Sequence, residues 1–153
     1  MRRKEREITD RQLLDEILIK SNTCRLAIND GEYPYIVALN YGYSDNYLYI
    51  HCAKEGKKID LLRKNNKVSF QIEYGNEIIP HEESCKWTTK YRSIVGQGEI
   101  EILSDFAEIT AGLDILMQQA GKKENEYNAK AVGHILILKL NITHISGKQA
   151  GDW

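Results

Sequence analysis

The sequence predicts a mainly β (α+β) fold, an antiparallel six-stranded barrel with peripheral helices. Three observations favour this class. Short runs of β-prone residues recur along the chain, turn residues of the Asp-Gly and Asn type separate them, and few segments show helical spacing. A chain of 153 residues has the size of one domain and can bury a core without disulfides. We therefore expect a single domain over residues 1–153.

Six segments are rich in β-branched and aromatic residues and are bounded by turn residues. In one of them the alternation is strict, so that Leu48 and Ile50 face one side while Tyr49 and His51 face the other. The strands that we expect are, in order, 23–29, 35–41, 47–53, 67–74, 87–103 and 134–145.

Three segments show apolar residues at helical spacing. The first opens with a capping box formed by Thr9 and Gln12. The second follows Gly56, and the third begins after Ser104 or Asp105. The apolar stripe of the third helix is expected to pack in the core or at a subunit interface.

Two further features of the sequence stand out. The polar segment 75–86 reads as a loop that is long enough to cover a site. Within the long strand 87–103, Gly96 and Gly98 are expected to produce a bend or a bulge.

Composition excludes several classes of function. The net charge of −1 argues against a general nucleic-acid binder. No apolar run approaches the roughly 20 residues that span a bilayer, and the charged segment 1–7 does not resemble a signal peptide. The chain has an odd number of cysteines, and they are well separated: Cys24, Cys52 and Cys85. We therefore expect reduced thiols and a cytoplasmic location.

The most informative stretch is 49–60, where a strand leads through Gly56 and two lysines, Lys57 and Lys58, into a helix. The first amides of a helix and its dipole favour an anion, and a glycine lets the backbone approach it closely. A phosphate monoester would fit this site. A solvated basic turn is the alternative.

Two other stretches are ambiguous by themselves. The long strand carries polar residues on both faces, with Lys90 and Arg92 on one side and Ser93 on the other. An exposed strand end would explain this pattern. The stretch 34–40 reads as a buried strand of the core.

Taken together and in this order, these stretches resemble the pyridoxamine-phosphate-oxidase-like FMN-binding split barrels, and among them the nitroimidazole-resistance (Nim-type) flavoproteins. The resemblance spans nearly the whole chain, and its strength lies in the order of the pieces rather than in any one of them. The matching segments are 1–4, 6–9, 34–37, 49–53, 55–58, 85–93 and 145–148.

The resemblance implies a homodimer with an FMN at each of two sites in the subunit interface. The segment 35–40 would lie along the flavin ring, and Lys57 and Lys58 would hold the phosphate. The strand with Arg92 and Ser93 would approach the flavin of the other subunit. FAD stays possible, because both flavins share the first phosphate. The implied cofactor-binding residues are Tyr35, Ile36, Val37, Ala38, Leu39, Asn40, His51, Cys52, Ala53, Lys57, Lys58, Arg92 and Ser93.

The implied activity is that of an FMN-dependent oxidoreductase that passes electrons to a small organic acceptor such as a nitroaromatic compound. NAD(P)H is a possible donor that would bind transiently, because the sequence has no Gly-rich dinucleotide fingerprint. His51 is the candidate catalytic residue, since an imidazole can exchange a proton near neutral pH. Its alternative role is that of a half-buried structural residue.

Several alternatives stay open. The pyridoxamine oxidases have an Arg-rich C-terminal segment for the substrate phosphate, whereas this chain has no arginine after Arg92, so pyridoxamine phosphate is not the expected substrate. A non-catalytic flavin-binding or storage protein is a second reading, and a barrel that binds haem or another cofactor is a third. Cys52 reads as a core thiol, and we expect no metal site, since His81 and Cys85 form at most an incidental pair.

Overall fold

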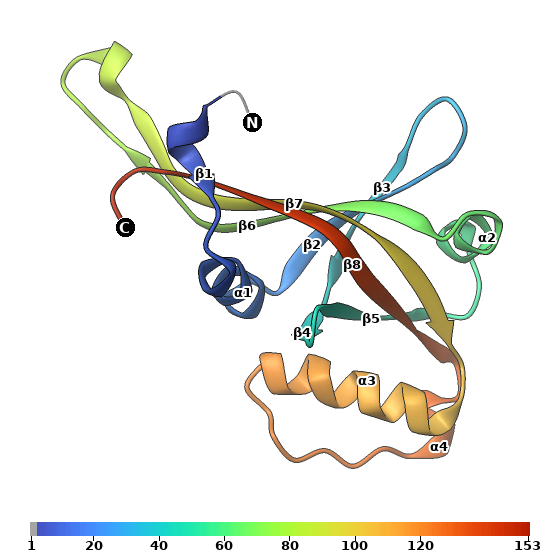
Figure 1. The fold of residues 1–153 in the computed structure, drawn as a ribbon. Coiled ribbons are helices and arrows are strands. Elements are labelled where there is room, and N and C mark those ends of the chain that lie inside the picture. Colours follow the sequence, from blue (N-terminus) through green and yellow to red (C-terminus); the bar gives the residue numbers. More distant parts are fainter. Residues whose placement is uncertain (1–2) are drawn as a thin grey trace.

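The computed structural model describes residues 3–153, so the first two residues of the N-terminal segment that supports the family resemblance lie outside it. Helices cover parts of a strongly curved sheet, and one hairpin projects from it (Figure 1). In chain order the elements are η1 (Lys4–Arg6), β1 (Glu7–Ile8), α1 (Arg11–Lys20), β2 (Thr23–Ile28), β3 (Tyr35–Asn40), β4 (Gly42–Ser44), β5 (Tyr47–Ala53), α2 (Lys57–Lys64), β6 (Lys67–Ile79), η2 (Ser84–Lys86), β7 (Thr88–Leu103), α3 (Phe106–Gln119), α4 (Ala129–Val132) and β8 (Ile135–Ala150).

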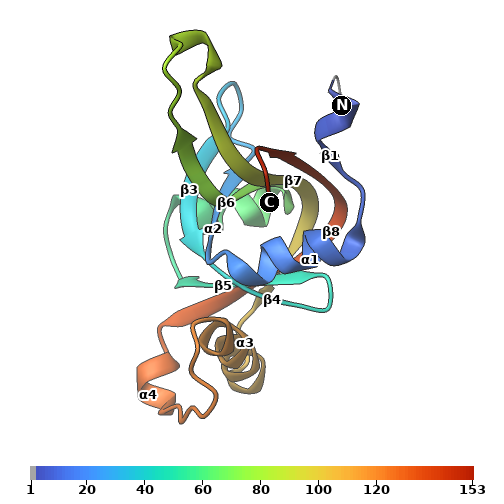
Figure 2. The same cartoon turned by 90° about the vertical axis from the view of Figure 1, so that its left-hand side faces the viewer.

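The strands form one antiparallel sheet in the order β3-β2-β6-β7-β8-β5-β4, with β1 paired to β8. The order does not return to its start, so the sheet is open and β3 and β4 are its end strands. Because the sheet curls, β3 nevertheless contacts β5 (Figure 2). The expected class, a split antiparallel barrel with peripheral helices, is confirmed.

The sheet has eight strands within the described residues, not the expected six. The six expected strands correspond to β2, β3, β5, β6, β7 and β8. The additional strands are β1, with two residues, and β4, with three. Strands this short carry no period of hydrophobicity, and only their pairing with β8 and β5 defines them.

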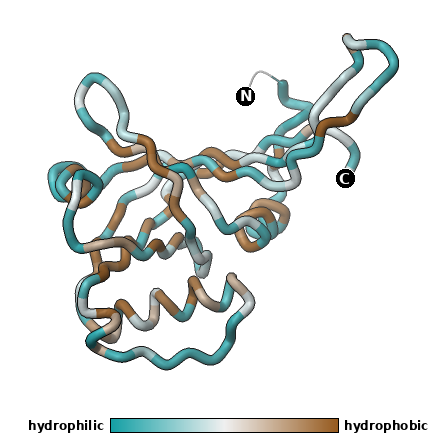
Figure 3. Tube along the Cα trace, turned by 180° about the vertical axis from the view of Figure 1, so that it is seen from behind, coloured by the Kyte–Doolittle hydropathy of each residue, from teal (hydrophilic) through white to brown (hydrophobic). Residues whose placement is uncertain are grey.

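The core lies inside the curve of the sheet. The alternation predicted for 47–53 is confirmed, because Leu48, Ile50 and Cys52 are buried while His51 and Ala53 are exposed. Helix α1 contributes Leu14 and Ile17 to the same core, and the hydrophobic stretches of the chain run along the strands and helices (Figure 3). A smaller apolar cluster joins α3 and α4 to β8.

The helix termini correct one expectation and confirm another. Helix α1 is capped by Asp10, whose Oδ1 accepts a hydrogen bond of 2.9 Å from the backbone N–H of Gln12. The expected capping box of Thr9 was therefore wrong by one residue, since an aspartate one position further on satisfies the first free amides. Of the two caps expected for helix α3, Ser104 and Asp105, the structure has Asp105, whose side chain accepts a bond of 3.0 Å from the amide of Ala107.

The hairpin of β6 and β7 forms an arm that projects from the sheet (Figure 1). The expected end of the fourth strand at Tyr74 was wrong, because β6 resumes pairing with β7 after a bulge between Tyr74 and Glu77 and runs to Ile79. Gly75 has a φ of 66° within this bulge. Of the expected loop 75–86, residues 75–79 therefore belong to β6 and residues 84–86 form η2, while residues 80–83 between them are a loop.

The last strand is also longer than expected, because β8 continues past Ile145 to Ala150, where it pairs with Tyr91. Because the last residues of β8 are polar, the hydrophobic pattern of the sequence does not indicate that they belong to a strand. The pairing of β7 with β8 shifts register between Gln97 and Gly98, so the bulge expected near these glycines is confirmed.

Candidate functional site

The free edge of β3 is one side of the candidate site. Within residues 3–153, β3 pairs only with β2, so its other edge presents backbone N–H and C=O groups without a strand partner. Its side chains alternate. Tyr35, Val37 and Leu39 are half-buried against the core, whereas Ile36, Ala38 and Asn40 point outward. A planar ligand with donor and acceptor groups could pair with such an edge.

The opposite side is β5, which the curl of the sheet brings into contact with β3. His51 and Ala53 are exposed on the outward face, whereas the Cys52 side chain is buried. Burial raises the pKa of the Cys52 thiol, and the positive charge of Lys58 opposes this rise only in part. At Cys52, therefore, only the backbone is placed to meet a ligand on this face.

The corner between β5 and α2 is the candidate anion site. Gly56 precedes α2 with a φ of 116° and gives the helix no side-chain cap. The amide of Ile59 donates to the Gly56 carbonyl at 2.9 Å, so the amides of Lys57 and Lys58 are the ones that the helix leaves available for an anion. The lysines at this helix start add positive charge. The Lys57 ammonium lies 2.5 Å from Asp30 Oδ2 and 5.2 Å from the centre of the Tyr35 ring. Lys57 thus connects α2 with the β2–β3 hairpin, beside the start of β3.

Arg92 and Ser93 lie elsewhere in the chain. His51 is in register with Ile137 of β8, and Ile137 pairs with Leu103 of β7. Arg92 lies eleven residues before Leu103, a separation of roughly 35 Å along a strand that rises about 3.3 Å per residue. The structure therefore gathers β3, His51 and the two lysines, but it does not bring Arg92 or Ser93 to them.

Arg92 has its own partners on the projecting arm. Its Nε donates to Gln149 Oε1 at 3.2 Å, and its guanidinium carbon lies 4.1 Å from the centre of the Trp153 ring. Lys90 approaches the same ring at 4.6 Å. Ser93 is on the other face of β7 and pairs in register with Lys148.

A cavity of about 350 Å³ opens where the ends of β3 and β5 approach α3. The apolar stripe of α3 was expected to pack in the core or at a subunit interface, and it was not expected to take part in a site. A helix far along the chain gives no signal that it will face His51, although Gln119 at the end of an apolar stripe is an unusual residue. The lining residues are Asn22, Asn40, Tyr41, His51, Leu113, Leu116, Met117, Gln119 and Ala120.

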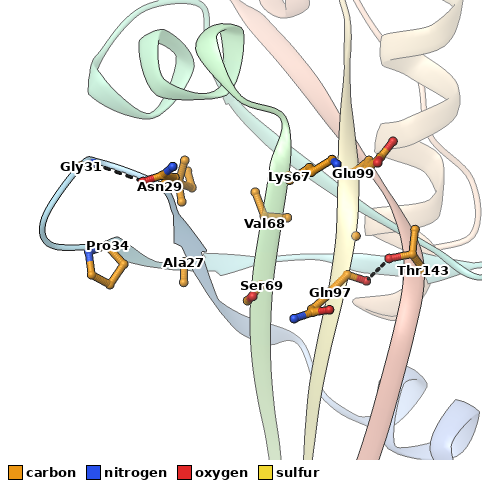
Figure 4. A pocket seen from close by; sticks show the side chains of 12 residues that line it. Ala27, Asn29, Gly31, Pro34, Lys67, Val68, Ser69, Gln97, Glu99 and Thr143 are labelled. Carbon is orange, nitrogen blue, oxygen red and sulfur yellow. Dashed lines mark hydrogen bonds between the residues drawn. The ribbon is translucent and has the colours of Figure 1, made fainter.

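A second cavity, of about 620 Å³, lies on the outward face of β2, β6 and β7 (Figure 4). The residues around it are small or neutral at its centre, with Ala27, Ser69 and Gln97 on three neighbouring strands and Thr143 donating to the Gln97 carbonyl at 3.2 Å. It is a shallow part of a broad sheet face and holds no cluster of reactive groups. Within residues 3–153, no group of three or more His, Cys, Asp or Glu side chains is placed to hold a metal ion.

Comparison with known proteins places this geometry in a family. The model of the family described as pyridoxamine 5'-phosphate oxidase matches residues 10–149. The structure is similar to that of a candidate 5-nitroimidazole antibiotic resistance protein from Bacteroides thetaiotaomicron, with 30% identity and a TM-score of 0.83, over 94% of this chain and 86% of that one. Because none of the helices in the described part is both long and apolar enough, no helix there could cross a membrane.

Other relatives are more distant. A FAD- and haem-binding protein from Mycobacterium smegmatis has 20% identity and a TM-score of 0.83 over 97% of this chain and 75% of that one. The flavocytochrome Anf3 from Azotobacter vinelandii has 15% identity and a TM-score of 0.84 over 99% of this chain and 72% of that one. These two show the fold alone. An uncharacterized protein of Rhizobium meliloti, RA0666, is 37% identical over 65 residues, which are 42% of this chain and 42% of that protein.

The open antiparallel sheet with its peripheral helices is therefore a split barrel. The chain belongs to the pyridoxamine 5'-phosphate oxidase family, whose model matches it over most of its length.

Proposed function

We propose that this chain is an FMN-dependent oxidoreductase that works as a homodimer and reduces a small organic acceptor. The observation that supports this most directly is the corner at Gly56, where unpaired helix amides and two lysines lie beside the free edge of β3. Such a corner suits a phosphate monoester, and the strand edge suits the polar rim of a planar ring. The residues present thus fit a flavin.

The charge at this corner favours FMN over FAD. Lys57 and Lys58 together carry two positive charges, and Asp30 already neutralises part of the charge on Lys57. One phosphate monoester matches the positive charge that remains. FAD would bring a second phosphate and an adenosine, which need further donors. FAD is therefore the alternative, to be distinguished by releasing the cofactor with heat and measuring its mass.

The residues of the candidate site would each have a separate role around the flavin. A bound flavin supplies the transfer of electrons between donor and acceptor. Lys57 and Lys58 would hold the phosphate, and the β3 backbone would orient the ring. His51 is exposed at the mouth of the cavity, where it could hold a proton for transfer to the acceptor.

A homodimer is favoured by the broad outward face of the sheet. Ile36 and Val95 are 62% and 52% exposed there. The cross-strand row of Ile36 continues through Ala27 and Ser69, whereas the row of Val95 contains the longer side chains of Gln71 and Arg25 before it reaches Ala38. Exposed apolar and small side chains along the row of Ile36 allow a second sheet face to pack there. A second copy would also bring another Arg92 and Ser93, which are too far along β7 to reach the site of their own chain.

The test of the cofactor site compares flavin content and FMN affinity in variants of the helix start. The double variant Lys57→Ala/Lys58→Ala should bind FMN at least tenfold more weakly, about 1.4 kcal/mol, because it removes both cations. The double variant Arg63→Ala/Lys64→Ala removes two charges from the other end of α2 and should keep its flavin. Equal FMN affinity in wild type and the Lys57/Lys58 variant would overturn the phosphate assignment.

The test of the activity is anaerobic. NADH or NADPH should bleach the flavin absorbance of the purified protein, and a 5-nitroimidazole should restore it. His51→Ala should slow this cycle more than it lowers flavin content. A protein that retains FMN but is neither reduced nor reoxidised would be a flavin carrier, and the proposed activity would fail. Unchanged turnover in His51→Ala would make His51 structural.

A further inference from the structure

The cavity beside His51 has two unlike sides. One side consists of polar residues at the ends of β3 and β5, and the other is the surface of α3, with Leu113, Leu116 and Met117. Leu113 and Leu116 also pack against the apolar cluster under the helix, whereas Met117 lines the cavity without belonging to that cluster. The α3 side therefore offers an apolar wall to whatever enters.

Most polar groups around the cavity already have partners in the protein. The Tyr41 hydroxyl donates to the Leu18 carbonyl at 2.8 Å. The Gln119 amide nitrogen donates to the carbonyls of Leu18 and Ser21, and its oxygen accepts from the amide of Tyr43. These groups hold α3 to the barrel and are not available to a ligand.

The groups left for a ligand are few. The Thr23 hydroxyl lies 3.1 Å from the side-chain oxygen of Asn22 and 3.3 Å from that of Asn40 and donates to one of them, which leaves the NH₂ groups of the two asparagines as donors at the cavity. The exposed imidazole of His51 is a further group at the mouth. All of them can donate to an oxygen of an entering molecule.

Charge is absent from the lining. Among the described residues that form this cavity there is no Lys, Arg, Asp or Glu. An anionic group that entered would lose its hydration without gaining a Lys or Arg partner in return, and burial of an unpaired charge is costly. Lys57 lies over Tyr35 at the start of β3, whereas the cavity is lined by Asn40 at the end of β3, and neither lysine of the phosphate corner lines it.

From these observations we propose that the α3 cavity is the acceptor pocket, and that it selects an uncharged, flat organic ring carrying a hydrogen-bond acceptor such as a nitro or carbonyl oxygen. The ring would lie against Met117, and its oxygen would accept from Asn40 or His51. Phosphorylated and carboxylated compounds are excluded by the same lining. This inference rests on the proposed flavin site, because only a flavin on β3 and β5 would make this cavity a place for an acceptor.

The test uses two probes of similar shape, 4-nitrotoluene and 4-nitrobenzoate, which differ in a methyl group against a carboxylate. Binding to the purified flavin-loaded protein is measured by titration calorimetry, and reoxidation of the reduced flavin gives the kinetic constant for each probe. Wild type should bind 4-nitrotoluene at least tenfold more tightly than 4-nitrobenzoate. Met117→Arg should remove or reverse this preference, since it places a cation in the apolar wall.

The matched control is Ala111→Arg, which adds the same charge to an exposed position of α3 that does not line the cavity. It should keep the wild-type preference, and both variants should keep their flavin content. Equal binding of the two probes in wild type would overturn the inference, and so would a Met117→Arg protein with the wild-type preference. A colourless wild-type protein that takes up no FMN would instead overturn the proposed function on which the pocket depends.

Discussion

At the scale of single residues, Asp30 is the unexpected member of the anion corner. Its carboxylate lies 2.5 Å from the Lys57 ammonium, so it neutralises part of the positive charge that the phosphate of the proposed cofactor needs. We expect Asp30→Asn to raise FMN affinity severalfold, because it removes a negative charge from the site, and to raise it more at low salt than at high salt.

The measurement is a fluorescence titration of the cofactor-free protein with FMN at two salt concentrations. Asp45→Asn, in the exposed turn before β5, is the control, because it removes the same charge far from the corner. Weaker binding in Asp30→Asn would mean that Asp30 serves to orient Lys57, and the competition argument would be wrong.

The three cysteines should differ in reactivity. Burial raises the pKa of Cys24 to about 12 and also raises the pKa of Cys52, so both stay protonated at pH 8, whereas Cys85 is exposed in η2. Because the thiolate is the reactive form, we expect an aromatic disulfide reagent to label one thiol quickly in the folded protein and three after unfolding. Cys85→Ser should lose the fast phase. Fast labelling of two thiols in the native state would contradict the burial of Cys24 or Cys52.

At the scale of elements, the contact between α3 and β4 depends on a glycine. A Cβ at position 42 would lie 2.7 Å from the backbone of Ile115 and Leu116. We therefore expect Gly42→Ala to lower the free energy of unfolding by about 1–3 kcal/mol, the usual cost of overpacking. Denaturant unfolding measures this change. Ser44→Ala on the same strand should have a small effect, and an unchanged midpoint in Gly42→Ala would show that α3 can shift without cost.

The elements that could be predicted are those whose own pattern determines them. The alternation in 47–53 predicted β5 and the face on which His51 lies, and the glycine and lysines after it predicted the start of α2. The extensions of β6 and β8 could not be predicted, because residues 75–79 are exposed and the last residues of β8 are polar, so only their pairing with β7 makes them strands.

The candidate site divides in the same way. The anion corner and His51 are close in sequence, and both were predicted. The α3 wall was not predicted, because Met117 and Gln119 approach His51 only through the packing of α3 on β4 and β5. The hydrogen bonds of Gln119 to three separate backbone groups are a tertiary arrangement that no local pattern contains.

At the scale of the whole molecule, the proposed dimer can be tested through Val95, which is 52% exposed at the centre of the outward sheet face. We expect Val95→Glu to give a monomer that also loses flavin, because a buried unpaired carboxylate is costly at an interface. Light scattering after gel filtration gives the mass, and absorbance gives the flavin content. Val95→Thr should remain a dimer. A flavin-loaded monomer of the wild type would contradict both the interface and the need for a second chain.

The open order of the sheet has a consequence for stability. Strand β3 is an end of that order, and β5 lies next to the other end, so no continuous hydrogen-bonded ladder joins the two sides of the site. A flavin bound to both β3 and β5 would bridge the two strands and hold the curled sheet closed. Because a ligand that binds only the folded state stabilises it by mass action, the melting temperature should climb with FMN concentration. Loss of the cofactor would then weaken the contact between β3 and β5 before the hydrophobic core unfolds.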